Sequence, residues 1–278
     1  MTVNKLIIFD YSGTLSLEST LFARPEYLMK QLTNSGLMAL GVSNPDVFWN
    51  EIVNPSWLEG STTPVGYKKV IEDGIAVIFD KTKKTAVPYG KIAEAASSFV
   101  DSYLDHSRID QRWQPVFTEF RRYPSLCVVI ATDHYAEATA YIIRYLSELQ
   151  IHAVAAKDAF TSSESVGVVV ANSADLGVHK ADHRFWEILK TGLNIHDVRE
   201  ILLVDDFGYN EQKGDSYGTQ EKVEQRKIDT KKLIRDIFSA AIHVLPFTIE
   251  SDERDKSFDR LIQQTNDLIE RYLRSTNG

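Results

Sequence analysis

The sequence predicts an α/β protein built on an open parallel sheet with helices on both faces, into which a mainly helical domain is inserted. Two observations predict this class. Short apolar runs that end in polar or acidic residues alternate with segments of helical periodicity along the chain. The first two runs are more than a hundred residues apart. One crossover helix needs far fewer residues, so the intervening segment predicts an insertion.

The apolar runs predict the strands. They are short and continuous and lack the alternation of a half-exposed strand, which is typical of strands buried on both faces of a parallel sheet. A further strand over His152–Ala156 stays open. The predicted strands, which together give a Rossmann-like sheet, are Lys5–Asp10, Leu126–Thr132, Val166–Ala171, Ile201–Asp206 and Ala241–Leu245.

Apolar residues spaced three or four positions apart predict the helices. The clearest stripe runs from Phe258 to Tyr272 and predicts a C-terminal helix. Shorter stripes at Ala138–Leu149 and Phe185–Leu189 predict helices between the strands.

The domain division follows from these elements. We expect residues 1–15 and 111–278 to form the α/β core and residues 16–110 to form the helical insertion. A stripe at Ile92–Tyr103 predicts a helix of the insertion, and one at Trp113–Phe120 predicts the core helix that leads into the second strand.

Two segments predict loops rather than regular structure. Residues 44–66 are rich in Pro, Asn, Ser and Gly, and residues 208–232 are charged and contain glycine. We expect the second segment to be a solvated loop rather than a flap over a site.

Composition and charge restrict the class of function. Of the 278 residues, 43% are hydrophobic, as in globular proteins, and the net charge is −8. That charge disfavours a nucleic-acid partner but allows a small phosphorylated molecule held by local cations. The sequence shows neither a signal peptide nor an apolar run long enough to cross a membrane, so we expect a cytoplasmic protein without a membrane partner. The single cysteine, Cys127, lies in an apolar run and predicts a buried thiol, and the oligomeric state stays open.

Polar side chains gather where the predicted strands end. Each one alone is typical of a helix cap, a turn or a solvated surface. Because the carboxyl ends of parallel strands share one edge of the sheet, we expect these side chains to surround one crevice. These residues are Asp10, Ser12, Thr132, Asp133, Asp205 and Asp206, together with Gly13 beside Ser12 and with Lys180, which lies just before the predicted helix that contains Phe185.

Taken in this order, the strand ends resemble the four-part signature of the haloacid dehalogenase-like superfamily. The resemblance is carried by residues 5–15 and 126–206. It includes the segment Leu176–Phe185, which contains Lys180 and has Ala181 where proline is commoner. The insertion lies where that family places its type C1 helical cap. The resemblance implies a Mg²⁺-dependent hydrolase, most often a phosphatase, that acts on a small phosphorylated metabolite.

The resemblance implies that Asp10 is the nucleophile and forms an aspartyl-phosphate, which divides one difficult displacement into two easier steps. It also implies that Mg²⁺ is bound by Asp10, Asp205 and Asp206 and by the main-chain carbonyl of Ser12, which is the hard oxygen ligand set that this ion prefers.

The remaining residues are implied to bind the phosphoryl group. Thr132 would donate its hydroxyl to a phosphate oxygen, and Lys180 would supply positive charge to Asp10 and to the transferring group. Gly13 and Asp133 are the other expected phosphate-binding residues.

Position 12 departs from the family pattern. Phosphatases of this group carry a second aspartate there, which protonates the leaving group and then activates water, whereas this chain has Ser12. A serine hydroxyl is a poor acid or base at neutral pH. Because such catalysis is typically worth about 10²–10⁴-fold, slow turnover is one expectation. His134 is a candidate proton donor in place of the missing aspartate, although a histidine at the start of a helix is the plainer interpretation. Glu211, with Asn210, is a candidate to orient a metal-bound water molecule.

Two alternatives to a phosphatase stay open. The first is another displacement at Asp10, either C–P bond cleavage or phosphoryl transfer to an acceptor other than water. C–P cleavage would need a lysine of the insertion, where Lys30, Lys68 and Lys69 lie outside any recognisable motif. The second is a non-catalytic protein that binds phosphate or a partner. Metal-free dehalogenation is disfavoured by the paired acids after the fourth strand.

The sequence does not identify the substrate. Arg24, Tyr27, Tyr67 and Lys68 of the insertion are candidates to face it, but each is more simply interpreted as part of a solvated or packed helix.

Overall fold

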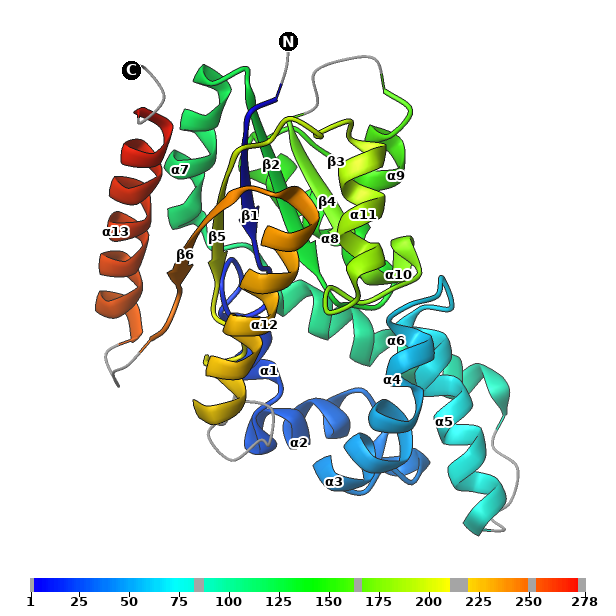
Figure 1. The fold of residues 1–278 in the computed structure, drawn as a ribbon. Helices are drawn as coiled ribbons and strands as arrows, with labels where there is room; N and C mark the ends of the chain where they lie inside the picture. Colours follow the sequence, from blue (N-terminus) through cyan, green and yellow to red (C-terminus); the bar gives the residue numbers. More distant parts are fainter. Residues whose placement is uncertain (1–2, 83–87, 163–166, 211–219, 250–253, 275–278) are drawn as a thin grey trace.

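The computed structural model describes residues 3–82, 88–162, 167–210, 220–249 and 254–274. Their central feature is one sheet of six parallel strands in the order β3-β4-β2-β1-β5-β6 (Figure 1). The predicted α/β class with a parallel sheet is therefore confirmed. The strands are β1 Lys5–Phe9, β2 Leu126–Thr132, β3 Ala153–Ala155, β4 Val168–Asn172, β5 Glu200–Asp205 and β6 Ala241–Pro246.

All five predicted strands are present within one or two residues. The open segment His152–Ala156 supplies β3, which pairs with β4 at the edge of the sheet. Residue 166, which was expected to begin the third predicted strand, lies outside the described residues, and β4 begins at Val168.

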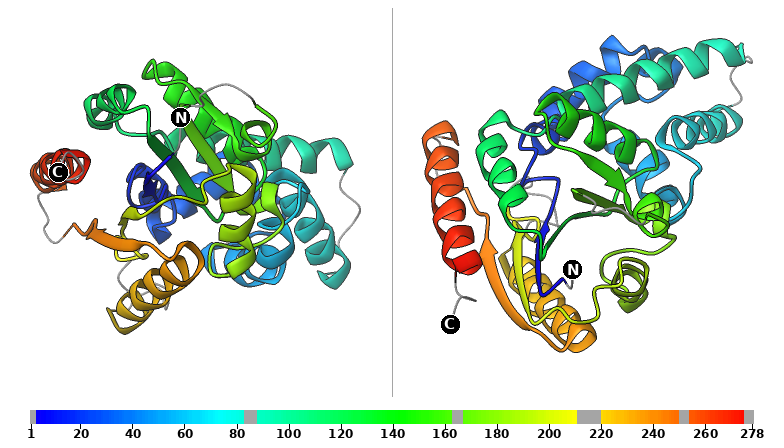
Figure 2. Two further views of the ribbon diagram at one scale, coloured as in Figure 1. Left: turned by 45° about the horizontal axis from the view of Figure 1, so that its top comes forward. Right: turned by 90° about the horizontal axis from the view of Figure 1, so that it is seen from above.

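Helices cover both faces of the sheet because the strand side chains alternate between two apolar layers. Ile7 and Phe9 pack with α7, α8 and α13, whereas Leu6 and Ile8 pack with α9, α11 and α12. Figure 2 shows both layers from other directions. The bounds are α7 Gln114–Glu119, α8 Glu137–Glu148, α9 Ala156–Ala159, α10 Ser173–Leu176, α11 His183–Gly192, α12 Gln220–Phe238 and α13 Arg254–Arg274, with short turns η3 Gln111–Trp113 and η4 Phe120–Arg122 beside α7.

The insertion is helical and lies at the end of the sheet where β1 and β2 finish, coloured blue to cyan in Figure 1. It has its own hydrophobic cluster, which runs from Phe22 to Leu104 and takes in Tyr135 of the core. Its elements are α1 Glu18–Phe22, α2 Pro25–Asn34, η1 Met38–Leu40, α3 Pro45–Val47, η2 Phe48–Val53, α4 Asn54–Gly60, α5 Tyr67–Thr82 and α6 Tyr89–His106.

The two chain crossings between core and insertion are tied to each other. Asp110 N donates to Leu15 O at 3.1 Å, and the Tyr11 hydroxyl donates to the carbonyl of Ser107. The chain therefore leaves the core and returns to it at one place, beside the loop that follows Asp10.

The loop prediction for residues 44–66 is wrong for most of its length. Residues 45–60 are helical because both prolines act as helix starters, which their fixed φ allows in the first turn. Pro45 follows the cap residue Asn44, whose side chain accepts from Val47 N at 2.9 Å, and Pro55 lies in the first turn of α4.

The loop prediction for residues 208–232 is also wrong beyond residue 219, because α12 begins at Gln220. This helix is mostly charged and exposed. Its buried stripe consists only of Val223, Ile234 and Phe238, which is too sparse to stand out in the sequence. Residues 211–219 lie outside the described part of the chain. Among the described helices, none combines the length and the apolar character that crossing a membrane requires.

We predict that the docking of α13 depends on Phe258. Its fully buried ring packs against Phe247 and Trp113, with ring centroids 5.6 and 6.3 Å apart. Phe258→Ala should lower the free energy of unfolding by about 3–5 kcal/mol in urea denaturation, because it leaves a cavity. The control Ile228→Ala, at an exposed position of α12, should change it by less than about 0.5 kcal/mol. Equal effects of the two substitutions would contradict this packing.

Candidate active site

The topology of the sheet brings three strand ends together. β1 lies between β2 and β5, and the chain fills one side of the sheet before it crosses to the other. The carboxyl end of β1 is thus the point where the strand order reverses, which is where open α/β sheets bind ligands. Phe9 pairs with Ile130 and with Val204, so the residues that follow all three strands emerge at nearly the same level.

Asp10 and Lys180 form an ion pair at this point, in which the Lys180 side chain is 22% exposed and the Asp10 side chain 10%. The Lys180 ammonium donates to Asp10 Oδ1, and it lies 3.8 Å from Asp205 Oδ2. Burial raises the pKa of Asp10 to about 7, although the adjacent Lys180 opposes this rise. Burial also lowers the pKa of Lys180, but the surrounding carboxylates of Asp10, Asp205 and Asp133 outweigh it and hold that pKa well above its usual range. The lysine is therefore charged.

The main chain of Lys180 is held on both sides. Its N–H donates to Asp133 Oδ1 at 2.8 Å, and its carbonyl accepts from Trp186 Nε1 at 2.8 Å. Asp133 was expected to bind phosphate. That role stays a prediction; the contact observed for its carboxylate is with Lys180 N, and it positions the lysine segment. Sequence reasoning missed Trp186, which appeared only as one residue inside a predicted helix.

Three carboxylates form a cluster that suits a divalent cation. One oxygen each from Asp10, Asp205 and Asp206 lies within 4.8 Å of the others, and the three residues are 7%, 7% and 2% exposed. Burial, followed by mutual repulsion, raises the pKa of Asp206 well above its usual range, and burial raises that of Asp205. A bound divalent cation would favour the charged forms of all three side chains, and hard oxygens are the ligands that Mg²⁺ prefers. The residues therefore fit this ion.

Main-chain donors hold the two acids that follow β5. Asp205 Oδ1 accepts from Phe207 N at 2.6 Å, and Asp206 accepts from Gly208 N at 3.0 Å and from Asn210 N at 2.8 Å. These bonds explain how a turn can hold two adjacent carboxylates in fixed directions.

Asn210 and Thr14 connect the loop after β5 to the loop after β1. The Asn210 amide donates to Gly13 O at 2.7 Å and to Phe247 O at 2.6 Å, and its oxygen accepts from Ile249 N. Thr14 Oγ1 accepts from Asp206 N at 3.1 Å. Asn210 was expected to help orient a water molecule, and its amide group forms its hydrogen bonds with the protein main chain. Its neighbour Glu211 lies outside the described residues.

Gly13 lies against Asp206 with a positive φ of 77°. A Cβ at this position would come within 2.5 Å of Asp206 Oδ2, so only glycine permits the approach. Its role in the structure is to let the first loop reach the carboxylate cluster.

The Ser12 hydroxyl forms a hydrogen bond within the protein. It lies 2.8 Å from the hydroxyl of Ser19, which itself donates to Ser16 O at 2.8 Å. Since the Ser19 proton is used in that bond, Ser12 is the donor in the pair. Ser12 thus directs its proton towards the first helix of the insertion. No local sequence pattern indicates this partner.

Thr132 ends β2 one residue beyond the level of Asp10. It is buried, and within the described part of the chain its hydroxyl makes no hydrogen bond. A hydroxyl that the protein leaves without a hydrogen-bond partner is suited to bond to a ligand atom.

His134 lies where core and insertion meet. Its Nδ1 accepts from Tyr135 N at 2.9 Å, so the proton is on Nε2 and is donated to the Tyr103 hydroxyl at 2.8 Å. The two rings are stacked, with centroids 5.6 Å apart. Burial lowers the pKa of His134 to about 4, so the ring is neutral at neutral pH. Both nitrogens are used, so this conformation offers no proton for a substrate.

The candidate substrate-facing residues of the insertion have other contacts. Lys68 forms an ion pair of 2.8 Å with Asp101, and Tyr67 stacks on Tyr135 with centroids 4.0 Å apart. Tyr27 packs in the insertion beside Phe22, and Arg24 is exposed where α2 begins. Lys69 pairs with Asp73, and Lys30 is exposed.

The structure therefore brings Asp10, Lys180, Asp205 and Asp206 into one cluster, with Gly13 and Asp133 in contact with it. Comparison with models of known protein families and with curated proteins found no match for this chain. The roles of these residues follow from their chemistry and geometry alone.

We predict that Mg²⁺ stabilises the folded protein through this cluster. At a concentration 100-fold above Kd, binding should add about 2.7 kcal/mol to the free energy of unfolding and raise Tm by several degrees relative to a chelator. Asp206→Asn should remove this shift, whereas Asp236→Asn, at an exposed position of α12, should keep it. A shift that persists in Asp206→Asn would place the ion elsewhere.

We predict that His134 makes the free energy of unfolding decrease as the pH falls. The unfolded chain takes up a proton near the ordinary pKa of 6.5, whereas the folded chain does so only near 4. The unfolded state therefore binds more protons between these values, and stability is lost as pH falls from about 6.5 to 4. The loss should be about 3 kcal/mol in urea denaturation. His134→Gln should lose that share of the pH dependence, and His243→Gln, at an exposed position of β6, should retain it.

Proposed function

We propose that this chain is a Mg²⁺-dependent hydrolase of the haloacid dehalogenase-like superfamily, acting on a small phosphorylated molecule through an aspartyl-phosphate on Asp10. The observation that carries this proposal is the buried cluster in which Asp10 is paired with Lys180 and adjoins Asp205 and Asp206. A carboxylate nucleophile, a fixed ammonium and a cation site in one place are what an anionic electrophile requires.

In the first step, a carboxylate oxygen of Asp10 forms a bond to phosphorus while the bond from phosphorus to the leaving oxygen breaks. The leaving oxygen takes a proton from water. Attack by a carboxylate on a phosphate is opposed by their like charges. When bound by Asp10, Asp205, Asp206 and the carbonyl of Ser12, Mg²⁺ supplies positive charge that offsets this repulsion.

Lys180 and Thr132 serve the phosphoryl group. The Lys180 ammonium, fixed by Asp133 and Trp186 through its main chain, offers positive charge where Asp10 attacks. The Thr132 hydroxyl donates to a phosphate oxygen. Both groups are in place before the substrate binds, so little reorganisation opposes the reaction.

In the second step, water attacks phosphorus and releases phosphate from Asp10. This step benefits from a base, and Ser12 directs its proton to Ser19 while His134 bonds to Tyr103 and Tyr135. We therefore expect hydrolysis of the aspartyl-phosphate to limit turnover. The same observation favours a second candidate function, transfer of the phosphoryl group from Asp10 to an acceptor that brings its own base.

We predict that the purified protein hydrolyses p-nitrophenyl phosphate slowly with Mg²⁺. Asp10→Asn should abolish turnover, because the amide is a poor nucleophile. Ser12→Asp should raise the turnover number by about 10²–10⁴-fold, because it supplies an acid and base. The matched control is Ser12→Asn, which has the same shape but cannot exchange a proton and should give no such increase.

Several outcomes separate the candidates. Inactive wild-type protein with active Ser12→Asp protein would favour phosphoryl transfer or a binding role. A beryllofluoride adduct on Asp10 would demonstrate a competent nucleophile even without turnover. Full activity of Asp10→Asn would refute the proposed chemistry.

A further inference from the structure

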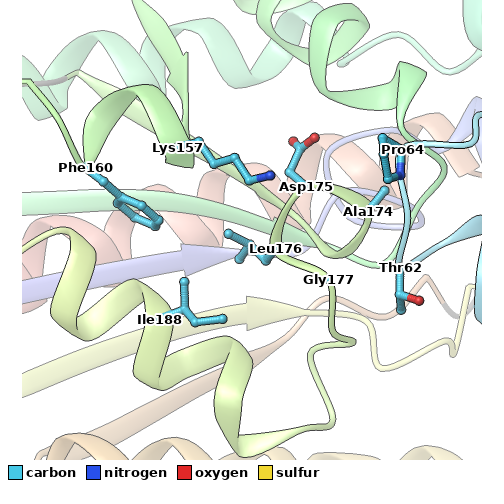
Figure 3. Close-up of a pocket in the computed structure, with 9 residues that line it drawn as sticks. All are labelled: Thr62, Pro64, Lys157, Phe160, Ala174, Asp175, Leu176, Gly177 and Ile188. Carbon is cyan, nitrogen blue, oxygen red and sulfur yellow. The ribbon is translucent and has the colours of Figure 1, made fainter.

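A surface cavity of about 400 Å³ lies where the insertion meets the core (Figure 3). Thr62 and Pro64, from the segment between α4 and α5, form one wall. The rest comes from α9, α10, α11 and Gly177 of the core. None of the side chains proposed to act on phosphate lines this cavity.

One side of the cavity is apolar. Phe160, Leu176 and Ile188 are half-buried and present hydrocarbon surface to it. A volume of this size is within the range of small-molecule sites, which combine apolar walls with a few polar groups that fix orientation. An apolar side chain of one small molecule would pack against these three residues.

The opposite side carries one positive and one negative group. Figure 3 shows the end of Lys157 beside Asp175, with Ile188 on the other side of the cavity. Asp175 Oδ2 accepts from Thr139 at 2.6 Å, which leaves Oδ1 for another donor. Among the described residues, neither Lys157 nor Asp175 forms an ion pair.

We propose that this cavity binds a free amino acid with an apolar side chain. Its carboxylate would accept from the Lys157 ammonium, its ammonium would donate to Asp175 Oδ1, and its side chain would rest on Leu176 and Ile188. A simple fatty acid would satisfy only the lysine, and an amine would satisfy only the aspartate. The adjacent opposite charges select a zwitterion.

Because insertion and core both line the cavity, a bound ligand would hold the two parts together. Ser61, directly before the insertion wall, accepts from Ser173 Oγ through its carbonyl at 2.6 Å. Its hydroxyl lies 2.6 Å from His179 Nε2, next to Lys180. Thr62 and Pro64 of the insertion complete the cavity, so a ligand that fills it contacts the insertion as well as the core and favours the arrangement in which the two are docked. Any effect on turnover rests on the proposed function, whereas binding does not.

Calorimetric titration of the full chain with L-leucine tests the proposal. We expect saturable binding of one molecule per chain. The matched probes 4-methylpentanoate, which lacks the ammonium, and 3-methylbutylamine, which lacks the carboxylate, should bind at least 10-fold more weakly. Absence of saturable binding by L-leucine and L-phenylalanine, or equal binding of the carboxylate alone, would overturn the proposal.

Two variants locate the site. Lys157→Met and Asp175→Asn should each weaken L-leucine binding at least 10-fold, and Asn at position 175 keeps an acceptor for Thr139. Lys91→Met, which removes an exposed ammonium on α6, should bind as the wild type does. Binding that survives both cavity variants would place L-leucine elsewhere and overturn the assignment.

Hydrogen exchange tests whether the ligand holds insertion and core together, without any measurement of turnover. The N–H groups of Tyr67 and Lys68 donate to Glu137 of the core at 2.8 and 3.3 Å, so their exchange reports separation of the insertion. L-leucine should slow their exchange, and binding without slowing would refute this role of the ligand. Because these readouts need no substrate, failure of the phosphatase proposal would leave them intact, and the reverse also holds.

Discussion

Like-charged carboxylates held together in a buried place are the constraint on which this structure depends. Asp10, Asp205 and Asp206 lose hydration at the end of the sheet, which raises the pKa of each, and repulsion within the cluster raises the pKa values of Asp10 and Asp206 further. One ammonium, Lys180, and a set of main-chain N–H groups compensate for part of this. Such an arrangement contributes little to stability by itself, which points to a role in binding a cation and an anion.

The surrounding loops hold the carboxylate cluster in place. Gly13 allows the first loop to approach Asp206, and Asn210 connects this loop to the ends of β5 and β6. Asp133 and Trp186 hold the main chain of Lys180 from opposite sides. Three separate strand ends are therefore joined through hydrogen bonds around Asp10.

The contact between insertion and core extends the same site outwards. Ser12, at the position where an acid and base would be expected, bonds to Ser19 of the insertion, and His134 bonds to Tyr103 of the insertion. Groups next to Asp10 thus hold the insertion in place, and in the proposed reaction they would not exchange protons with a substrate. Under the proposed function this would favour a long-lived aspartyl-phosphate, and the proposed ligand that bridges insertion and core would influence its lifetime.

The sequence by itself determined the class of fold and the identity of the clustered residues. Continuous apolar runs such as Leu126–Thr132 can be satisfied only by burial on both faces, and parallel strands place their carboxyl ends at one edge. Only the tertiary structure decided what each polar group bonds to. The proton of Ser12, the partner of Asp133 and the burial of His134 depend on residues far away in the chain, and local pattern carries no information about such contacts. Two helical regions were missed for a related reason. At residues 45–60 the prolines suggest loops, but proline starts a helix as readily as it ends one. In α12 the few apolar residues form a recognisable stripe only in the packed structure.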